Sequence, residues 1–353
     1  MICVACVFAC LASAVVPRDA AAVTMSMVTV GNPGNTADTG GYGAVPTSYQ
    51  ISKYEVTIGQ YVEFLNAVAK TSSETIFNTS YNANQNGGIS RTGNGTTGDL
   101  YVYSATGPRG TQYAAATTAN RPVTFVNWSN AARFANWMAN GQPSTGVQAA
   151  STTEDGAYNL SGATGVVALN LTNPNTSAAP IYALPTSDQW YKAAYYNGST
   201  GTYTDYATQS DIAPGNAVGS TPNQANVYVG TAPSGTYSIT QSSTLDSTQN
   251  YLTDVGSYSG SASYYGTFDQ TGNVSEWTST AGSTGSAILR GGAWNLNAFG
   301  AGAGLDISVT TANYDTGFRL VAPVPEPSTM GLLLAGLGGI GGWRWRRRQQ
   351  RLE

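Results

Sequence analysis

The sequence predicts an α+β fold that is rich in loops, with few short helices and small antiparallel sheets. Three short segments carry helix-capping residues ahead of apolar residues at helical spacing, and other short segments alternate in polarity as strands do. Glycine (42 residues) and proline (15) are frequent, and only 10% of the 353 residues are charged. Because proteins on average have roughly 25% charged residues, this composition indicates many turns and an uncharged polar surface.

A single domain is expected over residues 23–322. Hydrophobic residues make up 41% of the sequence, which is enough to build a core. The roughly 300 residues between the two ends are within the length that one domain can use. No repeat of fixed period divides them.

Capping residues predict where three helices begin. Thr57 forms a capping box with a glutamine three residues later, which predicts a helix over residues 58–69. Asn127 opens a second helix, which ends before Gly141. Thr186 caps the third, again with a glutamine three residues later.

Strands are expected where apolar residues alternate or form short runs. The pattern favours strands over residues 25–30 and 49–56, and a buried strand over residues 122–126. Residues 71–120 are rich in Asn, Gly and Thr, and their one apolar island, at residues 100–103, predicts a hairpin among long loops.

The stretch over residues 264–294 combines tight turns with two tryptophans and a carboxylate. Gly272 and Asn273 signal a turn, because glycine accepts a positive φ and asparagine tolerates one. A strand-like pattern then resumes at Glu276 and Trp277.

Two arginines near the end of this region are expected to be structural. Arg290 precedes Gly291 and Gly292, which let another backbone or a ring come close, so we expect Arg290 to be paired and stacked. We expect Arg319 to be buried and ion-paired as well. In the alternative interpretation, the two arginines bind a substrate.

The chain begins with a segment typical of a signal peptide. Residues 2–16 are an apolar run, and three alanines supply the small residues that a signal peptidase recognises, so residues 1–22 are interpreted as the signal. No Lys or Arg precedes the run, which indicates that the natural start lies upstream. The only cysteines of the sequence lie in this segment, at Cys3, Cys6 and Cys10. The mature protein would therefore have no disulfide.

The other end, residues 323–353, resembles the PEP-CTERM sorting signal of Gram-negative bacteria. Pro325, Glu326 and Pro327 are followed by an apolar run and an arginine cluster. An apolar helix of about 15 residues spans roughly 22 Å, short of a hydrocarbon core of about 30 Å, so we expect a transient inner-membrane anchor with its arginines in the cytoplasm. The resemblance implies cleavage by an exosortase-type enzyme, after which the mature domain lies at the outer surface or in the extracellular matrix.

Charge and residue inventory exclude several functions. Residues 23–322 hold nine Lys/Arg and sixteen Asp/Glu, a net charge of about −7, and no basic patch for nucleic acid. The sequence has no histidine, which excludes Ser-His-Asp and Cys-His catalysis, His-rich zinc sites and the iron-binding facial triad. The carboxylates Glu154 and Asp155 lie in a polar insertion and are interpreted as solvated loop charges.

Five ordered blocks between residues 49 and 319 resemble the formylglycine-generating enzyme, or sulfatase-modifying factor, family. Among them are RPVTFVNWSNAARFANWM, ALPTSDQWYKAAYY, GTFDQTGNVSEWT and ILRGGAW. The residues that carry the family motifs are Trp277, Arg290, Gly291, Gly292, Trp294, Gly317, Phe318 and Arg319. The resemblance implies the loop-rich fold of that family, which is distantly like the fold of C-type lectins.

The resemblance fails at the catalytic residues. In that family, two cysteines between the RGG and GFR motifs hold copper and activate oxygen, as suits the preference of Cu(I) for thiolates. Their positions fall on Leu296 and Ala301 here, and no cysteine lies between Trp294 and Phe318. We therefore expect neither copper nor formylglycine formation.

Two classes of function remain. In the first, the domain is a binding or structural module for a carbohydrate or protein ligand, since Tyr, Trp and Asn on a surface of low charge suit such contacts. In the second, it is a formylglycine-generating or other metal-dependent oxidase with ligands that the motifs do not reveal. Metal analysis of the purified domain would separate the two.

The resemblance also implies structural calcium, an ion that takes six to eight oxygen ligands, backbone carbonyls among them. One ion would bind Asn273, the carbonyl of Val274, and Glu276. A second would bind Asn226, the carbonyl of Val227 and a ligand from the stretch between Asp246 and Asp254. In the alternative interpretation, Asn273 only forms a turn and Glu276 pairs with an arginine.

Overall fold

The computed structural model describes residues 22–324, apart from residues 73–75, 107–117, 162, 164, 180, 232–233, 283–284, 304–306, 310 and 312. The signal segment and the sorting motif Pro325, Glu326 and Pro327 lie outside the described residues. Within them, no helix is both long and apolar enough to cross a membrane.

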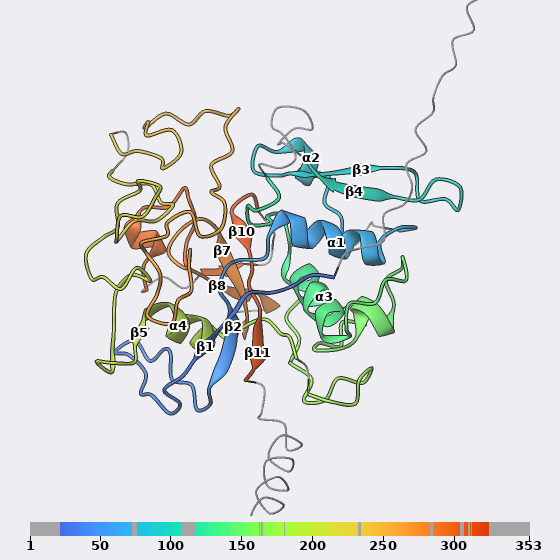
Figure 1. The fold of residues 1–353 in the computed structure, drawn as a ribbon, viewed down its shortest axis with the longest axis horizontal. Helices are drawn as coiled ribbons and strands as arrows, with labels where there is room; N and C mark the ends of the chain where they lie inside the picture. Colours follow the sequence, from blue (N-terminus) through green and yellow to red (C-terminus); the bar gives the residue numbers. More distant parts are fainter. Residues whose placement is uncertain are drawn as a thin grey trace, which may run out of the picture.

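The fold is α+β and rich in loops, as predicted (Figure 1). Its helices are short: α1 (Ile58–Val68), α2 (Ser80–Ala83), α3 (Trp128–Ala139), α4 (Ser187–Tyr195), the π-helix η3 (Ala150–Glu154) and the 3₁₀-helix η5 (Ala298–Ala301). The first strands are β1 (Met27–Val30), β2 (Tyr49–Ser52), β3 (Ile89–Thr92), β4 (Val102–Ala105), β5 (Tyr196–Asn197) and β6 (Thr202–Tyr203). The last are β7 (Ser275–Ala281), β8 (Ala287–Arg290), β9 (Ile307–Val309), β10 (Thr316–Gly317) and β11 (Val321–Pro323).

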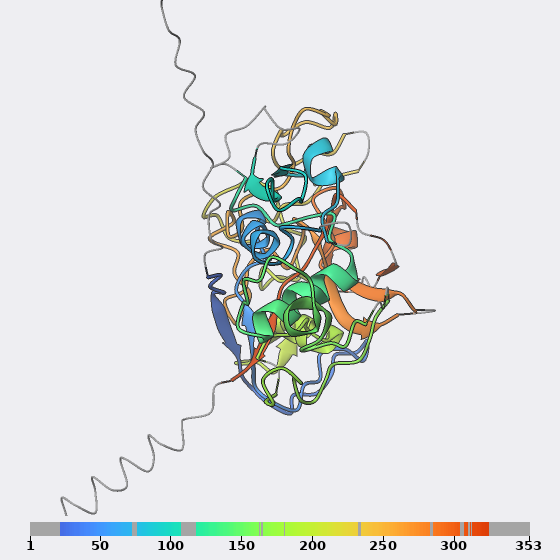
Figure 2. The same cartoon turned by 90° about the vertical axis from the view of Figure 1, so that its right-hand side faces the viewer.

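Two small sheets organise the molecule. One has the order β1-β2-β11 and is antiparallel, so it joins the start of the domain to its end. The other has the order β10-β7-β8-β9, and its β10–β7 pair is parallel. The strands β3 and β4, and β5 and β6, form separate two-stranded hairpins. In Figure 2 the sheets that contain β1 and β7 lie on different sides of α3.

The helix predictions are confirmed to within one or two residues. Both capping boxes are present: Thr57 accepts from the backbone of Gln60, and Thr186 caps α4 in the same way. Asn127 caps α3, every residue of which is buried. A helix that is buried all round lies inside the core, and Phe134 of α3 contacts Phe318 edge-on with ring centroids 5.5 Å apart.

Two strand predictions need correction. Residues 122–126 form no strand, because Phe125 has a φ of +57°, a left-handed conformation that breaks the pleat; only Pro122 makes an isolated bridge, to Thr57. The strand expected over residues 49–56 ends at Ser52, since the next carbonyl, of Lys53, accepts instead from the backbone of Phe268.

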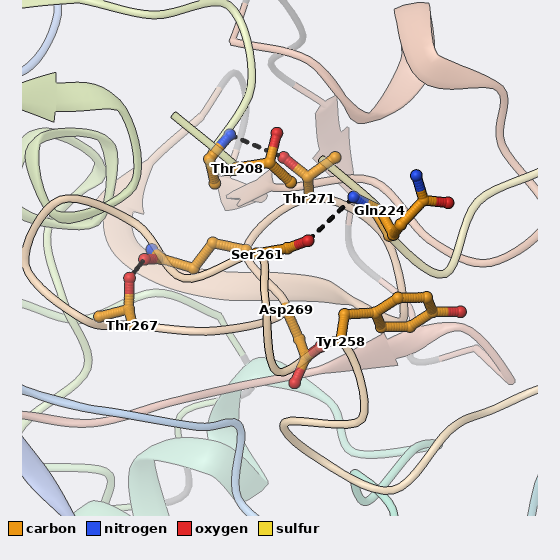
Figure 3. A pocket seen from close by; sticks show the side chains of 10 residues that line it. Thr208, Gln224, Tyr258, Ser261, Thr267, Asp269 and Thr271 are labelled. Atoms are coloured by element: carbon orange, nitrogen blue, oxygen red, sulfur yellow. Dashed lines mark hydrogen bonds between the residues drawn. The ribbon is translucent and has the colours of Figure 1, made fainter. Parts of the chain in front are cut away.

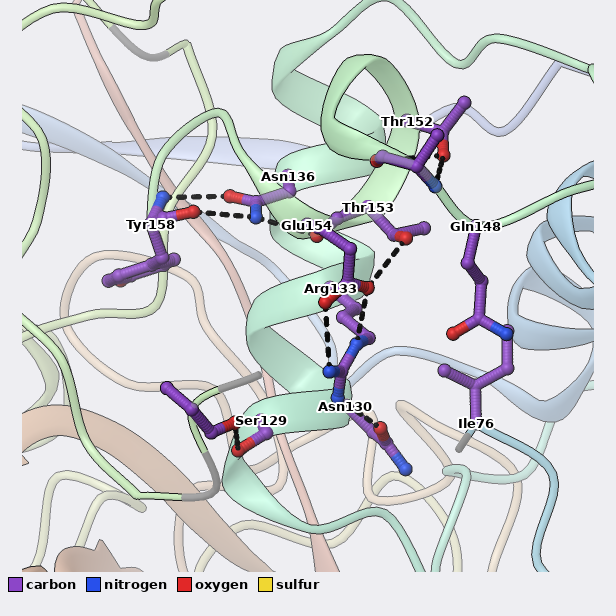
Figure 4. A network of polar contacts seen from close by, with 12 residues as sticks. Ile76, Ser129, Asn130, Arg133, Asn136, Gln148, Thr152, Thr153, Glu154 and Tyr158 are labelled. Carbon is purple, nitrogen blue, oxygen red and sulfur yellow. Dashed lines mark hydrogen bonds and ion pairs between the residues drawn. The ribbon is translucent and has the colours of Figure 1, made fainter. Parts of the chain in front are cut away.

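The interpretation of Glu154 as a solvated loop charge is also wrong. Glu154 ends the π-helix η3 and receives two hydrogen bonds from Arg133 of α3, at 2.7 and 3.0 Å (Figure 4). Asn136, one turn further along α3, donates to the backbone of Thr153 and exchanges hydrogen bonds with the backbone of Tyr158. The polar insertion is thus attached to the core helix by buried side chains.

Candidate functional site

A buried ion pair lies at the junction of the two sheets. Arg319, which follows β10, donates to both carboxylate oxygens of Glu276 in β7, at 2.6 and 2.7 Å, and both side chains are fully buried. The indole of Trp190 in α4 donates to the same carboxylate at 2.8 Å. Arg319 also donates to the carbonyls of Ser52 and Phe268. The arginine partner that the alternative interpretation offered for Glu276 is therefore present.

Two further acids lie close to this pair. Glu55 is 1% exposed and accepts from the side chain of Asn273 at 3.0 Å, while its other oxygen has no partner. Burial, aided by the charge of Asp269, raises the pKa of Glu55 well above its ordinary value. Burial, aided by the charge of Glu276, raises the pKa of Asp269 to about 6, against the opposing hydrogen bond from the backbone of Gly256. Burial next to one paired arginine thus raises the pKa of both Glu55 and Asp269.

The turn at Gly272 and Asn273 has the predicted conformation, with φ values of +84° and +61°. The side-chain oxygen of Asn273 accepts from the amide of Asn226 at 3.0 Å and from the backbone of Thr253 at 3.1 Å. The backbone N–H of Asn273 donates to the carbonyl of Asn226. The residues of the two predicted calcium sites therefore lie side by side.

These contacts decide how well the predicted residues fit calcium. The oxygens of Glu276 and Asn273 are occupied by donors, one of them a guanidinium, and the carbonyl of Val227 accepts from Asn216 at 3.3 Å. An ion here would have to displace them, and it would lie against the positive charge of Arg319. In this arrangement the residues do not form a calcium cage, and an ion would bind only if these groups exchanged their partners for it. Calcium binding by these residues, Val274 included, stays a prediction.

Arg290 is buried and stacked, as predicted. Its guanidinium lies 4.3 Å from the ring centre of Tyr42 and 5.2 Å from that of Tyr191, and its Nε donates to Ser187 at 2.9 Å. Gly291 follows it with a φ of +90°, and a Cβ there would come within 2.9 Å of the ring of Trp190. The RGG motif thus packs against aromatic rings and has a structural role.

A layer of aromatic rings lies beyond the RGG motif. Trp294 stacks on Tyr251 with ring centres 4.7 Å apart, and Tyr237 contacts both rings, at 5.7 and 5.1 Å. Tyr228 extends the layer on one side and Tyr314 on the other. We call these five residues the aromatic layer. The side chains come from separate loops, so no spacing in the sequence predicted it.

Polar groups without partners gather in and beside the aromatic layer. Buried and without a hydrogen-bond partner are the indole nitrogen of Trp294, the amide nitrogen of Asn250, the amide oxygen of Asn295 and the hydroxyl of Thr240. Thr240 also lines an open hollow of about 500 Å³ with Ser242, Thr244, Leu245, Asp246 and Ser247. The hollow joins the layer, because the backbone of Asp246 donates to the hydroxyl of Tyr251 at 2.7 Å. Buried groups of this kind are rare in native proteins and need a partner such as water or a ligand.

A second cavity is too small for a ligand. Polar side chains line it, among them Thr208, Gln224, Tyr258, Ser261, Thr267, Asp269 and Thr271 (Figure 3). Its volume of about 10 Å³ is close to the minimum for one water molecule. We therefore assign it to the scaffold.

The two positions of the family's cysteines lie next to the aromatic layer. Leu296 is half-buried, and its carbonyl accepts from the backbone of Tyr228 at 2.9 Å. Ala301, in η5, is fully buried in an apolar cluster with Ala225 and Val227. Among the described residues, no group of three or more Cys, Asp, Glu or His side chains is arranged to hold a metal ion.

The family model of the sulfatase-modifying factor enzyme 1-like domain matches residues 18–324. The chain belongs to this family. The model of the PEP-CTERM protein-sorting motif matches residues 323–348, so this sulfatase-modifying-factor domain is exported and processed from a membrane-anchored precursor. No curated protein matches the chain.

Three solved structures are similar to this chain. Treponema denticola variable protein 1 is 17% identical, with a TM-score of 0.46, and the match covers 86% of this chain and 97% of that one. CarF is 20% identical (TM-score 0.44; 86% and 99% covered). PvdO from Pseudomonas aeruginosa is 15% identical (TM-score 0.42; 84% and 94% covered).

Proposed function

We propose that this exported sulfatase-modifying-factor domain is a binding module without catalytic activity, and that its ligand is a neutral polysaccharide at the outer surface or in the extracellular matrix. The observation that carries the proposal is the open hollow beside the aromatic layer, together with the unpaired polar groups in and beside that layer. Of these groups, the hydroxyl of Thr240 belongs to a residue that lines the hollow. Trp294 and Asn250 need acceptors, whereas Asn295 needs a donor. A hydroxyl supplies both, and sugars carry many hydroxyls.

The chemistry of the surrounding surface supports a neutral ligand. Tyrosine rings offer contact area at a small entropic cost, and Tyr228, Tyr237 and Tyr314 of the layer are half-buried. The net charge of about −7 on residues 23–322 disfavours an acidic chain. Tryptophan, which the sequence suggested as a surface residue, contributes no exposed surface, because each of the five described tryptophans is buried.

Loss of the oxidase activity follows from the side chains at the family's cysteine positions. Leu296 and Ala301 cannot supply thiolates, and the buried setting of Ala301 is apolar. The purified protein, given copper, oxygen and a sulfatase-type peptide, should leave the peptide's cysteine intact. Mass spectrometry of the peptide checks this, and formylglycine that increases with the amount of protein would refute it.

A glycan and exopolysaccharide binding screen tests the binding proposal itself. We expect neutral polysaccharides to be retained, and binding to weaken in Tyr237→Leu, which removes a ring of the aromatic layer while keeping apolar volume. Tyr264→Leu is the matched control, because Tyr264 is 38% exposed and lies outside the layer. Equal binding by both variants would place the ligand elsewhere, and retention of no glycan would refute the proposal.

A further inference from the structure

An apolar groove lies where the described chain ends. Val321, Ala322 and Pro323 of β11 form part of its wall, and Leu169 and Leu171 from the segment after η3 form another part. The groove has a volume of about 350 Å³, and none of its described lining residues is charged. The remaining lining residues are Thr47, Ser48, Tyr49, Asn170, Ala179, Ala183, Leu184, Thr186, Gln189 and Ser279. In Figure 1, β11 ends at the lower edge of the molecule.

Large aliphatic side chains at this groove point into solvent. Leu171 is 92% exposed and Leu169 is 48% exposed. Ile181, which lies in the sequence between the lining residues Ala179 and Ala183, is 51% exposed. Contiguous exposed apolar side chains mark surfaces that meet a protein or a membrane. We call the groove with these three residues the apolar rim.

The position of the sorting signal limits how far the apolar rim can lie from the bilayer. The matched motif begins at Pro323, inside the groove wall, and the apolar run of the signal begins at Met330. Residues 324–329 connect the two, and six residues reach at most about 20 to 22 Å when fully extended. The rim is therefore held close to the bilayer surface as long as the tail is anchored.

We propose that the apolar rim is a membrane-contact surface of the anchored precursor, with the lipid surface as its partner. The tether keeps the rim at a high local concentration of lipid, so a modest apolar contact is enough to dock it. No charge of the groove has to be dehydrated on contact. Once the tail is cut, the tether is lost and the domain is released, which suits a contact that exists only before processing.

The test places an environment-sensitive dye at the rim of the intact precursor. Leu171→Cys is made in a chain whose Cys3, Cys6 and Cys10 are replaced by Ser, and the precursor is purified from a host without the processing enzyme. It is reconstituted into vesicles of phosphatidylethanolamine and phosphatidylglycerol. Ile212→Cys is the matched control, since Ile212 is aliphatic, 75% exposed and outside the groove.

We expect a blue shift of the dye at residue 171, and quenching by lipids that carry a doxyl group on the acyl chain. The dye at Ile212→Cys should show neither. With the dye moved to Ile181→Cys, the second substitution Leu171→Asp should abolish the shift, and because Leu171 is exposed the fold should survive.

Three results would overturn the proposal. The dye at residue 171 could match the control, which means that the rim stays in water. The shift could occur without lipid quenching and grow with the number of chains per vesicle, in which case the partner is a second copy. The shift could require addition of the processing enzyme, which would then be the occupant of the groove.

Discussion

At the residue scale, the ion pair of Arg319 and Glu276 shows which role Glu276 has in the structure. Arg319 and Glu276 are fully buried, and Arg319 donates to both carboxylate oxygens of Glu276. The sequence showed that Arg319 would be ion-paired, but it left two roles open for Glu276. The structure decides between them, because the partner of Glu276 lies 43 residues away, between β10 and β11.

Removing one member of this pair should destabilise the domain strongly. Glu276→Gln leaves a buried guanidinium without a counter-charge, so we expect the free energy of unfolding to fall by about 3 to 5 kcal/mol. Glu154→Gln is the control: its pair with Arg133 is more accessible, and a loss of about 1 kcal/mol is expected there. Urea unfolding measures both, and equal losses would contradict this ranking.

The raised pKa of Asp269 predicts a pH dependence of stability. Its folded pKa of about 6 exceeds its ordinary value of 3.8, so the folded state binds more protons between these pH values. The stabilisation from protonated Asp269 is complete below about pH 4 and is lost as the pH rises through 6, a change of about 1 to 3 kcal/mol. Unfolding of wild type and Asp269→Asn at several pH values gives the difference. A difference independent of pH would refute the assignment.

At the element scale, local signals predicted the helices and failed for the chain between them. Capping boxes act within four residues, so α1 and α4 were found from Thr57 and Thr186. The left-handed Phe125 and the π-helix η3 depend on distant contacts, such as the bonds from Arg133 to Glu154. A pattern within a short stretch of sequence therefore cannot predict these two features.

The turn before β7 offers a direct test of backbone packing. Gly272 has a φ of +84°, and a Cβ there would lie 2.3 Å from the carbonyl oxygen of Asn226. Gly272→Ala should therefore cost about 2 to 4 kcal/mol. Gly141→Ala has the same backbone strain, with a φ of +79° and no atom within 4 Å of the added Cβ, and should cost about 1 to 2 kcal/mol. Similar losses in thermal or urea unfolding would show that the contact with Asn226 is unimportant.

The predicted binding of calcium at this turn can be tested by thermal unfolding. An ion with an affinity typical of extracellular modules, Kd of about 10⁻⁴ to 10⁻³ M, would add about 0.4 to 1.4 kcal/mol at ~1 mM calcium. That gain raises the Tm by about 1 to 5 °C, and the rise should disappear in Asn226→Ala and in Glu276→Ala. Melts that coincide in calcium and EDTA would leave Glu276 as the partner of Arg319 alone.

At the scale of the whole molecule, the chain has the sulfatase-modifying-factor domain, with Leu296 and Ala301 where the sequence resemblance expects cysteines. The motifs of the sequence predicted this architecture, because each block retains its structural residues. The candidate site was not predicted: Tyr237, Tyr251 and Trp294 meet only when three loops converge. From the sequence came the expectation that thiolate chemistry is absent, because Leu296 and Ala301 stand at the positions where the resemblance implies cysteines.

The most direct test of the binding account is calorimetric titration of the purified protein with the neutral polysaccharide that a screen retains. Wild type and Tyr264→Leu should bind equally, and Tyr237→Leu should bind about tenfold more weakly, which corresponds to ~1.4 kcal/mol. Thermal melts establish that each variant is folded. Unchanged affinity in folded Tyr237→Leu would contradict the claim that the aromatic layer binds the ligand.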